Sequence, residues 1–215
     1  MTGVRAVPQK IIVLCERVDI ASFVDNYTKY LRKQGNNIPE CRIVNIQKLE
    51  NFQAYLDKLE QTESFKNIDK IVLIADAGAR RLVTEHAIFK AKTNSFLENF
   101  NFEVFLFPMK SAAGNWTPGF MEDLLLPALK QDTSECSYFY NLHNIAREYI
   151  FSVHNSRGKE NHFVNYNRNF LYSYFAGTEK FVGLRLGEAA AKGAFNLGHE
   201  SFKDLRAFLS KLEFV

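Results

Sequence analysis

The sequence is poor in cysteine and has no long apolar run. Its three cysteines, Cys15, Cys41 and Cys136, lie far apart and show no CxxC or Cys/His ligand spacing, which argues against a zinc site and a disulfide framework. No apolar run approaches the ~20 residues of a membrane span, and the five apolar residues 11–15 are too few for a signal-peptide core. We therefore expect a cytoplasmic protein with no membrane association.

Signatures of the common cofactor and hydrolase sites are also missing. Neither GxxxxGK(S/T) nor GxGxxG occurs, so the sequence does not indicate a P-loop or a dinucleotide site. No serine lies in a GxSxG elbow, and the five histidines show no HExxH or comparable ligand spacing. Nucleophilic hydrolases and histidine-ligated metal enzymes are therefore disfavoured.

What the sequence does contain is ordinary core material. Of 215 residues, 47% are hydrophobic and 24% charged, which is typical of a globular protein and enough to bury a substantial core. The formal net charge of +3 permits contact with nucleic acid but does not predict it, because phosphate binding needs clustered Lys and Arg. With no repeat or linker, we expect one domain over 1–215, with a core at about 8–131 and a helical annex at about 132–215.

Short apolar runs alternate with helical periodicity along the first half of the chain. Helical stripes run from Ile20 to Leu31 and from Leu49 to Leu59, and a further helical stretch covers about 80–100. This alternation predicts an α/β fold, a parallel sheet flanked by helices on both faces. The predicted strands are 10–15, 41–46, 70–75 and 103–107.

The second half of the chain reads as loop and helix. Turn formers over 111–119 predict a loop, and 120–130 looks helical despite Pro127. Stripes that start at Phe139 and Phe202 predict annex helices, whereas the polar stretch 154–169 predicts an exposed connection. Aromatic runs at 138–140 and 170–175 belong either to the annex core or to a face for self-association, so a homo-oligomer is one expectation.

Acidic residues follow the predicted strands at the edge where a parallel sheet binds its ligands. Glu16 follows the first strand, Asp76 the third, and Glu122 the loop after the fourth. Clustered carboxylate oxygens suit Mg²⁺ or Mn²⁺, which commonly bridge to phosphate. Carboxylates also stabilise helix N-termini as caps, so the pattern leaves metal binding and capping open.

These segments together resemble a known family. The motifs 11–16, 71–76 and 118–126, with the C-terminal segments 183–191 and 202–209, are similar to a Toprim-related family of uncharacterised bacterial proteins allied to the OLD-type nucleases. The resemblance covers nearly the whole chain, although each motif is short. It implies a Toprim-like parallel sheet with a C-terminal helical annex.

The resemblance also implies roles for individual residues. Glu16 would be the catalytic acid or base, and Asp76 a ligand of Mg²⁺ or Mn²⁺, with Glu122 as a further acidic ligand. The chain departs from the Toprim pattern after Glu16, where Arg17 replaces the usual glycine, and the next acidic residue could only be Asp19 at a shifted spacing.

A second departure lies at the third strand, where Gly78 replaces the second aspartate of the Asp-x-Asp motif. Losing this carboxylate removes a metal ligand and a negative charge, so metal affinity should fall unless Asp19 or Glu122 substitutes.

Two functional hypotheses follow, with a structural role in a larger assembly as a third. The first is Mg²⁺-dependent phosphodiester hydrolysis or phosphoryl transfer on nucleic acid, as in a nuclease. The second is a catalytically degenerate Toprim-like module that binds or regulates a nucleic-acid or protein partner.

Overall fold

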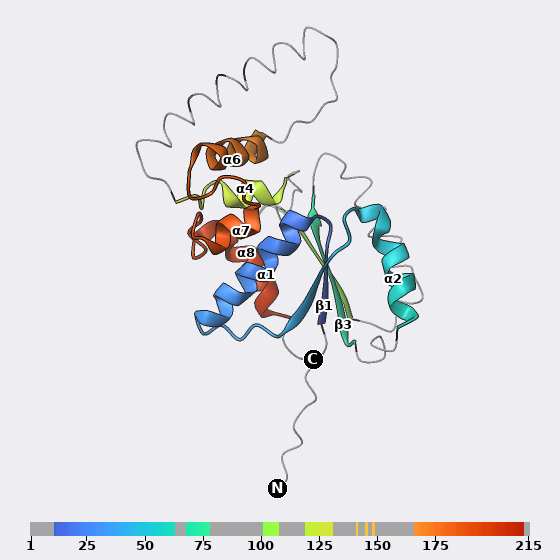
Figure 1. Ribbon diagram of the computed structural model, residues 1–215. Coiled ribbons are helices and arrows are strands. Elements are labelled where there is room, and N and C mark those ends of the chain that lie inside the picture. Colours follow the sequence, from blue (N-terminus) through green and yellow to red (C-terminus); the bar gives the residue numbers. More distant parts are fainter. Residues whose placement is uncertain are drawn as a thin grey trace, which may run out of the picture.

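A parallel sheet forms the centre of the molecule. The computed structural model describes residues 11–62, 68–77, 101–107, 119–130, 141, 145, 148 and 166–212 (Figure 1). All three strand pairings are parallel, and the strand order is β2-β1-β3-β4. The predicted α/β class is therefore confirmed. The strands are β1 (Ile11–Cys15), β2 (Cys41–Asn45), β3 (Lys70–Asp76) and β4 (Asn101–Phe107).

The two faces of the sheet carry separate hydrophobic clusters, because successive side chains of a strand point to opposite faces. Helix α1 (Val18–Lys33) covers one face, and α2 (Phe52–Glu60), preceded by the short helix η1 (Leu49–Asn51), covers the other (Figure 1). β1 and β3 are buried along their whole length, as the predicted apolar runs require.

The first helix follows its predicted stripe closely. Ile20, Phe23, Val24, Tyr27 and Leu31 are all at most 1% exposed. The helix ends two residues before Gly35, whose φ of +80° places it in the left-handed region that glycine adopts most readily. The sequence pattern therefore predicted both the buried face of α1 and the place where the helix ends.

The C-terminal helices share the hydrophobic cluster of α1 and the sheet. Helix α7 (Leu186–Ala191) lies against α1, and a Cβ at Gly187 would come within 2.6 Å of the Phe23 backbone nitrogen. Only glycine permits this approach. The proposed annex boundary near 132 lies outside the described residues. These helices are α6 (Tyr166–Gly177), α7 (Leu186–Ala191), η4 (Glu200–Phe202) and α8 (Lys203–Ser210).

The helix predicted over 120–130 is shorter than expected. Helix α4 spans Met121–Leu125, a turn follows, and Leu129 pairs with Phe195 in an isolated antiparallel bridge. Pro127 explains the early end, because it has no N–H with which to continue the helical hydrogen bonds.

The polar connection predicted over 154–169 is wrong at its C-terminal end, where Tyr166–Gly177 forms helix α6. Phe170 and Leu171 are buried in the core, and this burial outweighs the polar composition of the first turn. The predictions for 80–100 and 111–118 lie outside the described residues.

Two remaining observations concern helices. Asn141, Ile145 and Glu148 are helical and exposed, which agrees with a helix whose apolar stripe lies at other positions. Within the described ranges, no helix has the length and apolar character needed to cross a bilayer.

Candidate functional site

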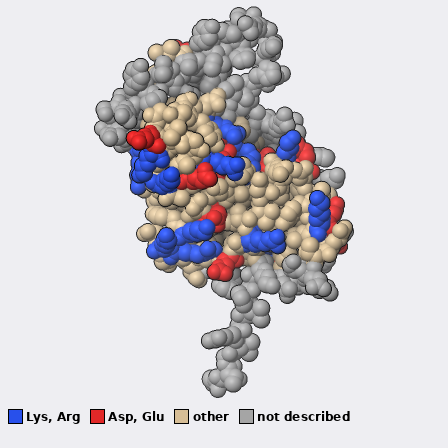
Figure 2. Space-filling view, viewed as in Figure 1, with Lys and Arg blue, Asp and Glu red and all other residues tan. Residues whose placement is uncertain are grey.

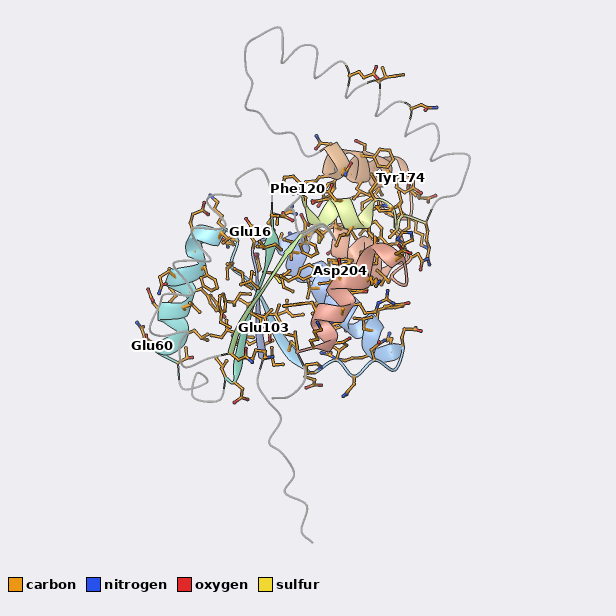
Figure 3. All side chains as sticks on the ribbon, turned by 180° about the vertical axis from the view of Figure 1, so that it is seen from behind. Glu16, Glu60, Glu103, Phe120, Tyr174 and Asp204 are labelled. Atoms are coloured by element: carbon orange, nitrogen blue, oxygen red, sulfur yellow. The ribbon has the colours of Figure 1, made fainter. Side chains whose placement is uncertain are left out.

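The acidic residues meet at the carboxyl end of the sheet. Glu16 directly follows β1, Asp76 is the last residue of β3, and Glu122 lies in the first turn of α4. Figure 3 shows Glu16 and Phe120, the residue before α4, at the same end of the sheet. We call this group, with Asp19 of α1, the acidic edge.

Backbone hydrogen bonds hold two of these carboxylates in place. Glu16 Oε2 accepts a hydrogen bond from the Asp76 backbone N–H at 3.0 Å, and Asp76 Oδ1 accepts one from the Met121 N–H at 2.9 Å. Asp123 Oδ2 accepts the Phe120 N–H at 2.7 Å. Asp76 and Asp123 therefore both satisfy N–H groups at the start of α4, which is the capping role that the sequence left open.

Arg17 lies between two buried carboxylates, those of Asp76 and Glu122. Its Nη2 is 2.7 Å from Asp76 Oδ2, and its Nη1 and Nη2 donate to Glu122 Oε1 and Oε2, each at 3.1 Å. The Glu122 side chain is fully buried and that of Asp76 is 9% exposed. A two-pronged guanidinium–carboxylate pair of this kind is among the strongest polar contacts in proteins.

The buried setting changes how these groups titrate. Burial raises the pKa of Asp76 to about 7, and Glu122 and Glu16 add to the rise while Arg17 and the Met121 N–H oppose it. Burial also raises the pKa of Glu16, against the Asp76 N–H and Arg17, which lower it. For Arg17, burial lowers the pKa, but the charges of Asp76 and Glu122 outweigh it and leave the pKa raised.

A second arginine reaches the acidic edge from α6. Arg168 Nη2 lies 3.3 Å from Asp19 Oδ2, and its Nε lies 3.9 Å from Glu122 Oε1. The guanidinium carbon is 5.7 Å from the centre of the Tyr172 ring. The pKa of Tyr172 is raised to about 12, mainly by burial and then by the charge of Asp19 and a hydrogen bond to its side chain. Asp19 thus joins the acidic edge through α6.

The structure brings together every predicted site residue. It also adds two arginines, Arg17 and Arg168, to which the sequence assigns no role in the site. Arg17 was recognised only as a departure from a glycine, although its place directly after Glu16 was a usable signal. Arg168 had no such signal, because it lies 149 residues from Asp19 in a stretch read as an exposed connection. Its role depends on the packing of α6.

The donor set can be compared with the needs of a divalent cation. Mg²⁺ binds carboxylate oxygens at about 2.1 Å in a near-octahedral shell. Here Arg17 Nη2 itself lies between Asp76 and Glu122, at 2.7 and 3.1 Å from their oxygens. In the part of the chain that the structure describes, no group of three or more His, Cys, Asp or Glu could hold a metal ion. The Mg²⁺ or Mn²⁺ site stays a prediction.

No family model, curated protein or solved structure matches the chain. Any function must therefore be argued from the geometry of the acidic edge.

Proposed function

We propose that this chain is a Toprim-like binding or regulatory module, without metal-dependent turnover, whose acidic edge is closed by its own arginine. The observation that carries this proposal is the position of Arg17, which bonds Asp76 and Glu122 at once. A permanent guanidinium there neutralises the charge that a divalent cation would otherwise neutralise.

Displacing Arg17 would be costly. Breaking a buried ion pair by removing one partner typically costs about 3–5 kcal/mol, because a charge is left buried without compensation. A cation entering between Asp76 and Glu122 would have to expel the arginine or bind beside a like charge. Both routes weaken metal binding at this edge.

The charge distribution bears on the class of partner. Figure 2 shows Lys and Arg interspersed with Asp and Glu on the viewed face, with no continuous basic surface among the coloured residues. A phosphate backbone is held by clustered cations, so this face favours a protein partner over a nucleic acid. The acidic edge, where carboxylates predominate, favours the same choice.

A second candidate is the Mg²⁺-dependent phosphodiester hydrolysis or phosphoryl transfer predicted from the sequence. Its supporting observation is the gathering of carboxylates at the acidic edge, where, among the described residues, Asp76 and Glu122 contact Arg17, Glu122 and Asp19 lie near Arg168, and Glu16 accepts the Asp76 N–H. Clustered carboxylate oxygens of this kind would attract a divalent cation.

Isothermal calorimetry with Mn²⁺ separates these candidates. We expect no binding to the wild type, binding to Arg17→Gly, and loss of that binding in Arg17→Gly/Asp76→Asn. Cleavage of single- and double-stranded DNA and RNA, assayed in parallel with Mg²⁺ and Mn²⁺, should be absent in the wild type. Wild-type binding with metal-dependent cleavage, both lost in Asp76→Asn, would replace the module by a nuclease.

The Arg17→Gly variant leaves buried carboxylates without their partner and needs a check on folding. Circular dichroism and thermal unfolding with and without Mn²⁺ provide it, because a ligand that binds only the folded chain raises the melting temperature. Arg17→Gln, a neutral side chain with more of the original volume, repeats the measurement if the glycine variant is unfolded. A melting temperature that Mn²⁺ leaves unchanged in both variants contradicts the idea that Arg17 closes the site.

A further inference from the structure

Arg168 shares a carboxylate with Arg17 although it comes from the other end of the chain. Glu122 Oε1 lies 3.1 Å from Arg17 Nη1 and 3.9 Å from Arg168 Nε. Arg168 Nη2 lies 3.3 Å from Oδ2 of Asp19, a residue that is only 4% exposed. The two guanidiniums therefore form a continuous chain of contacts with Asp76, Glu122 and Asp19.

The position of Arg168 is fixed by neighbouring contacts on α6. Its guanidinium lies against the Tyr172 ring one turn further along, and Tyr172 hydrogen-bonds to Asp19. In the adjacent position, Asn167 Nδ2 donates to Asp123 Oδ1 at 2.5 Å and ties the start of α6 to α4. Phe170 and Leu171, both at most 2% exposed, anchor the helix in the core.

This arrangement has a consequence for cations. If Arg17 alone were removed, Glu122 and Asp19 would still face the positive charge of Arg168. Two like charges about 4 Å apart repel each other, and the repulsion grows as the local dielectric falls. A divalent cation at Glu122 would experience this repulsion twice over, because it carries two charges.

We propose that Arg168 is a specificity-determining residue: a second internal counter-ion that excludes divalent cations from the acidic edge. This inference rests on the proposed function, because it assigns the closure of the edge to two arginines instead of one. It also gives α6 a role beyond packing, since α6 supplies the second positive charge.

The test compares Mn²⁺ affinity in the Arg17→Gly background. Adding Arg168→Gln should raise the affinity about tenfold, whereas Arg168→Lys, which keeps the charge, should leave it near that of Arg17→Gly. Arg185→Gln is the matched control, because Arg185 is an exposed arginine of the same C-terminal part, and it should change nothing. Isothermal calorimetry measures all four variants.

Equal affinity in the Arg168→Gln and Arg185→Gln double variants would overturn the inference while leaving the closure by Arg17 intact. Equal gains from Arg168→Gln and Arg168→Lys would also overturn it, because packing and not charge would then set the affinity. Metal-dependent cleavage by the wild type would instead overturn the proposed function. If the glycine background does not fold, the same comparison is made in Arg17→Gln.

Discussion

The two ends of β3 handle buried charge in different ways. At the amino end, Lys70 is buried and its Nζ lies 2.9 Å from Glu103 Oε1 on β4, so one cation meets one carboxylate. At the carboxyl end, Asp76 belongs to the acidic edge, where, within the described ranges, carboxylates from several elements lie near Arg17 and Arg168. In the part of the chain that the structure describes, the amino end is a single pair, whereas the carboxyl end gathers several carboxylates around arginines from α1 and α6.

The origin of the partners differs as well. Lys70 and Glu103 come from neighbouring strands, and the β3–β4 register places them diagonally across the ladder. Arg17 and Glu122 are 105 residues apart, and Arg168 and Asp19 are 149 apart. The acidic edge is therefore assembled by the tertiary fold, at the carboxyl end of a parallel sheet, where ligands bind.

Removing Arg17 should have the largest effect on this comparison. Arg17→Met keeps the apolar stem but leaves Asp76 and Glu122 buried without a counter-ion, which should lower the free energy of unfolding by about 3–5 kcal/mol. Urea denaturation at pH 8 measures it. Adding Glu122→Gln should recover part of the loss, because one of the stranded charges is then removed. If Arg17→Met lowers the free energy of unfolding no more than Lys70→Met does, the proposed difference between the two ends is contradicted.

The pH dependence of stability should be the next largest effect. The folded pKa of Asp76, about 7, lies above its ordinary value of 3.8, so the folded chain keeps a proton that the unfolded chain has lost. Stability from this group is therefore full at low pH and falls as the pH rises from about 4 to about 7, at about 1.4 kcal/mol per unit of pKa difference.

Urea unfolding of wild type and Asp76→Asn across pH 5 to 8 checks this expectation. Between pH 5 and about 7 the wild type should lose roughly 2–3 kcal/mol relative to the variant, since about two pH units contribute about 1.4 kcal/mol each. Glu16, whose pKa is also raised, remains in both proteins and cancels. Parallel pH profiles for the two proteins would show that Asp76 titrates normally.

The sequence predicted which carboxylates lie at the carboxyl end of the sheet, but it did not predict the arginines that pair with them. Glu16, Asp76 and Glu122 were placed at one edge because parallel strands end there, a rule that needs only strand order. The metal prediction drew on carboxylates alone and did not weigh the charge of Arg17, although Arg17 directly follows Glu16. Arg168 was hidden because the polar first turn of α6 is held by core residues further along the helix, which local composition does not reveal.

Lys70→Met sharpens the comparison from the amino end. Met retains the buried stem, and the partner left behind, Glu103, has a side chain that is 32% exposed and can be solvated. We expect a loss of about 1–2 kcal/mol in urea unfolding, smaller than for Arg17→Met. A loss of 3 kcal/mol or more would place both ends in the same class.

Arg168→Gln should have the smallest effect on stability. Its side chain is 42% exposed, and its contacts of 3.3 and 3.9 Å are long for an ion pair, so about 0.5–1 kcal/mol is expected. Urea unfolding measures it against Arg185→Gln, for which no loss is expected. A loss above 2 kcal/mol would make Arg168 mainly a structural anchor of α6. A small loss combined with a tenfold gain in Mn²⁺ affinity in the Arg17→Gly background would separate specificity from stability, because excluding a cation requires a nearby charge but not a strong bond.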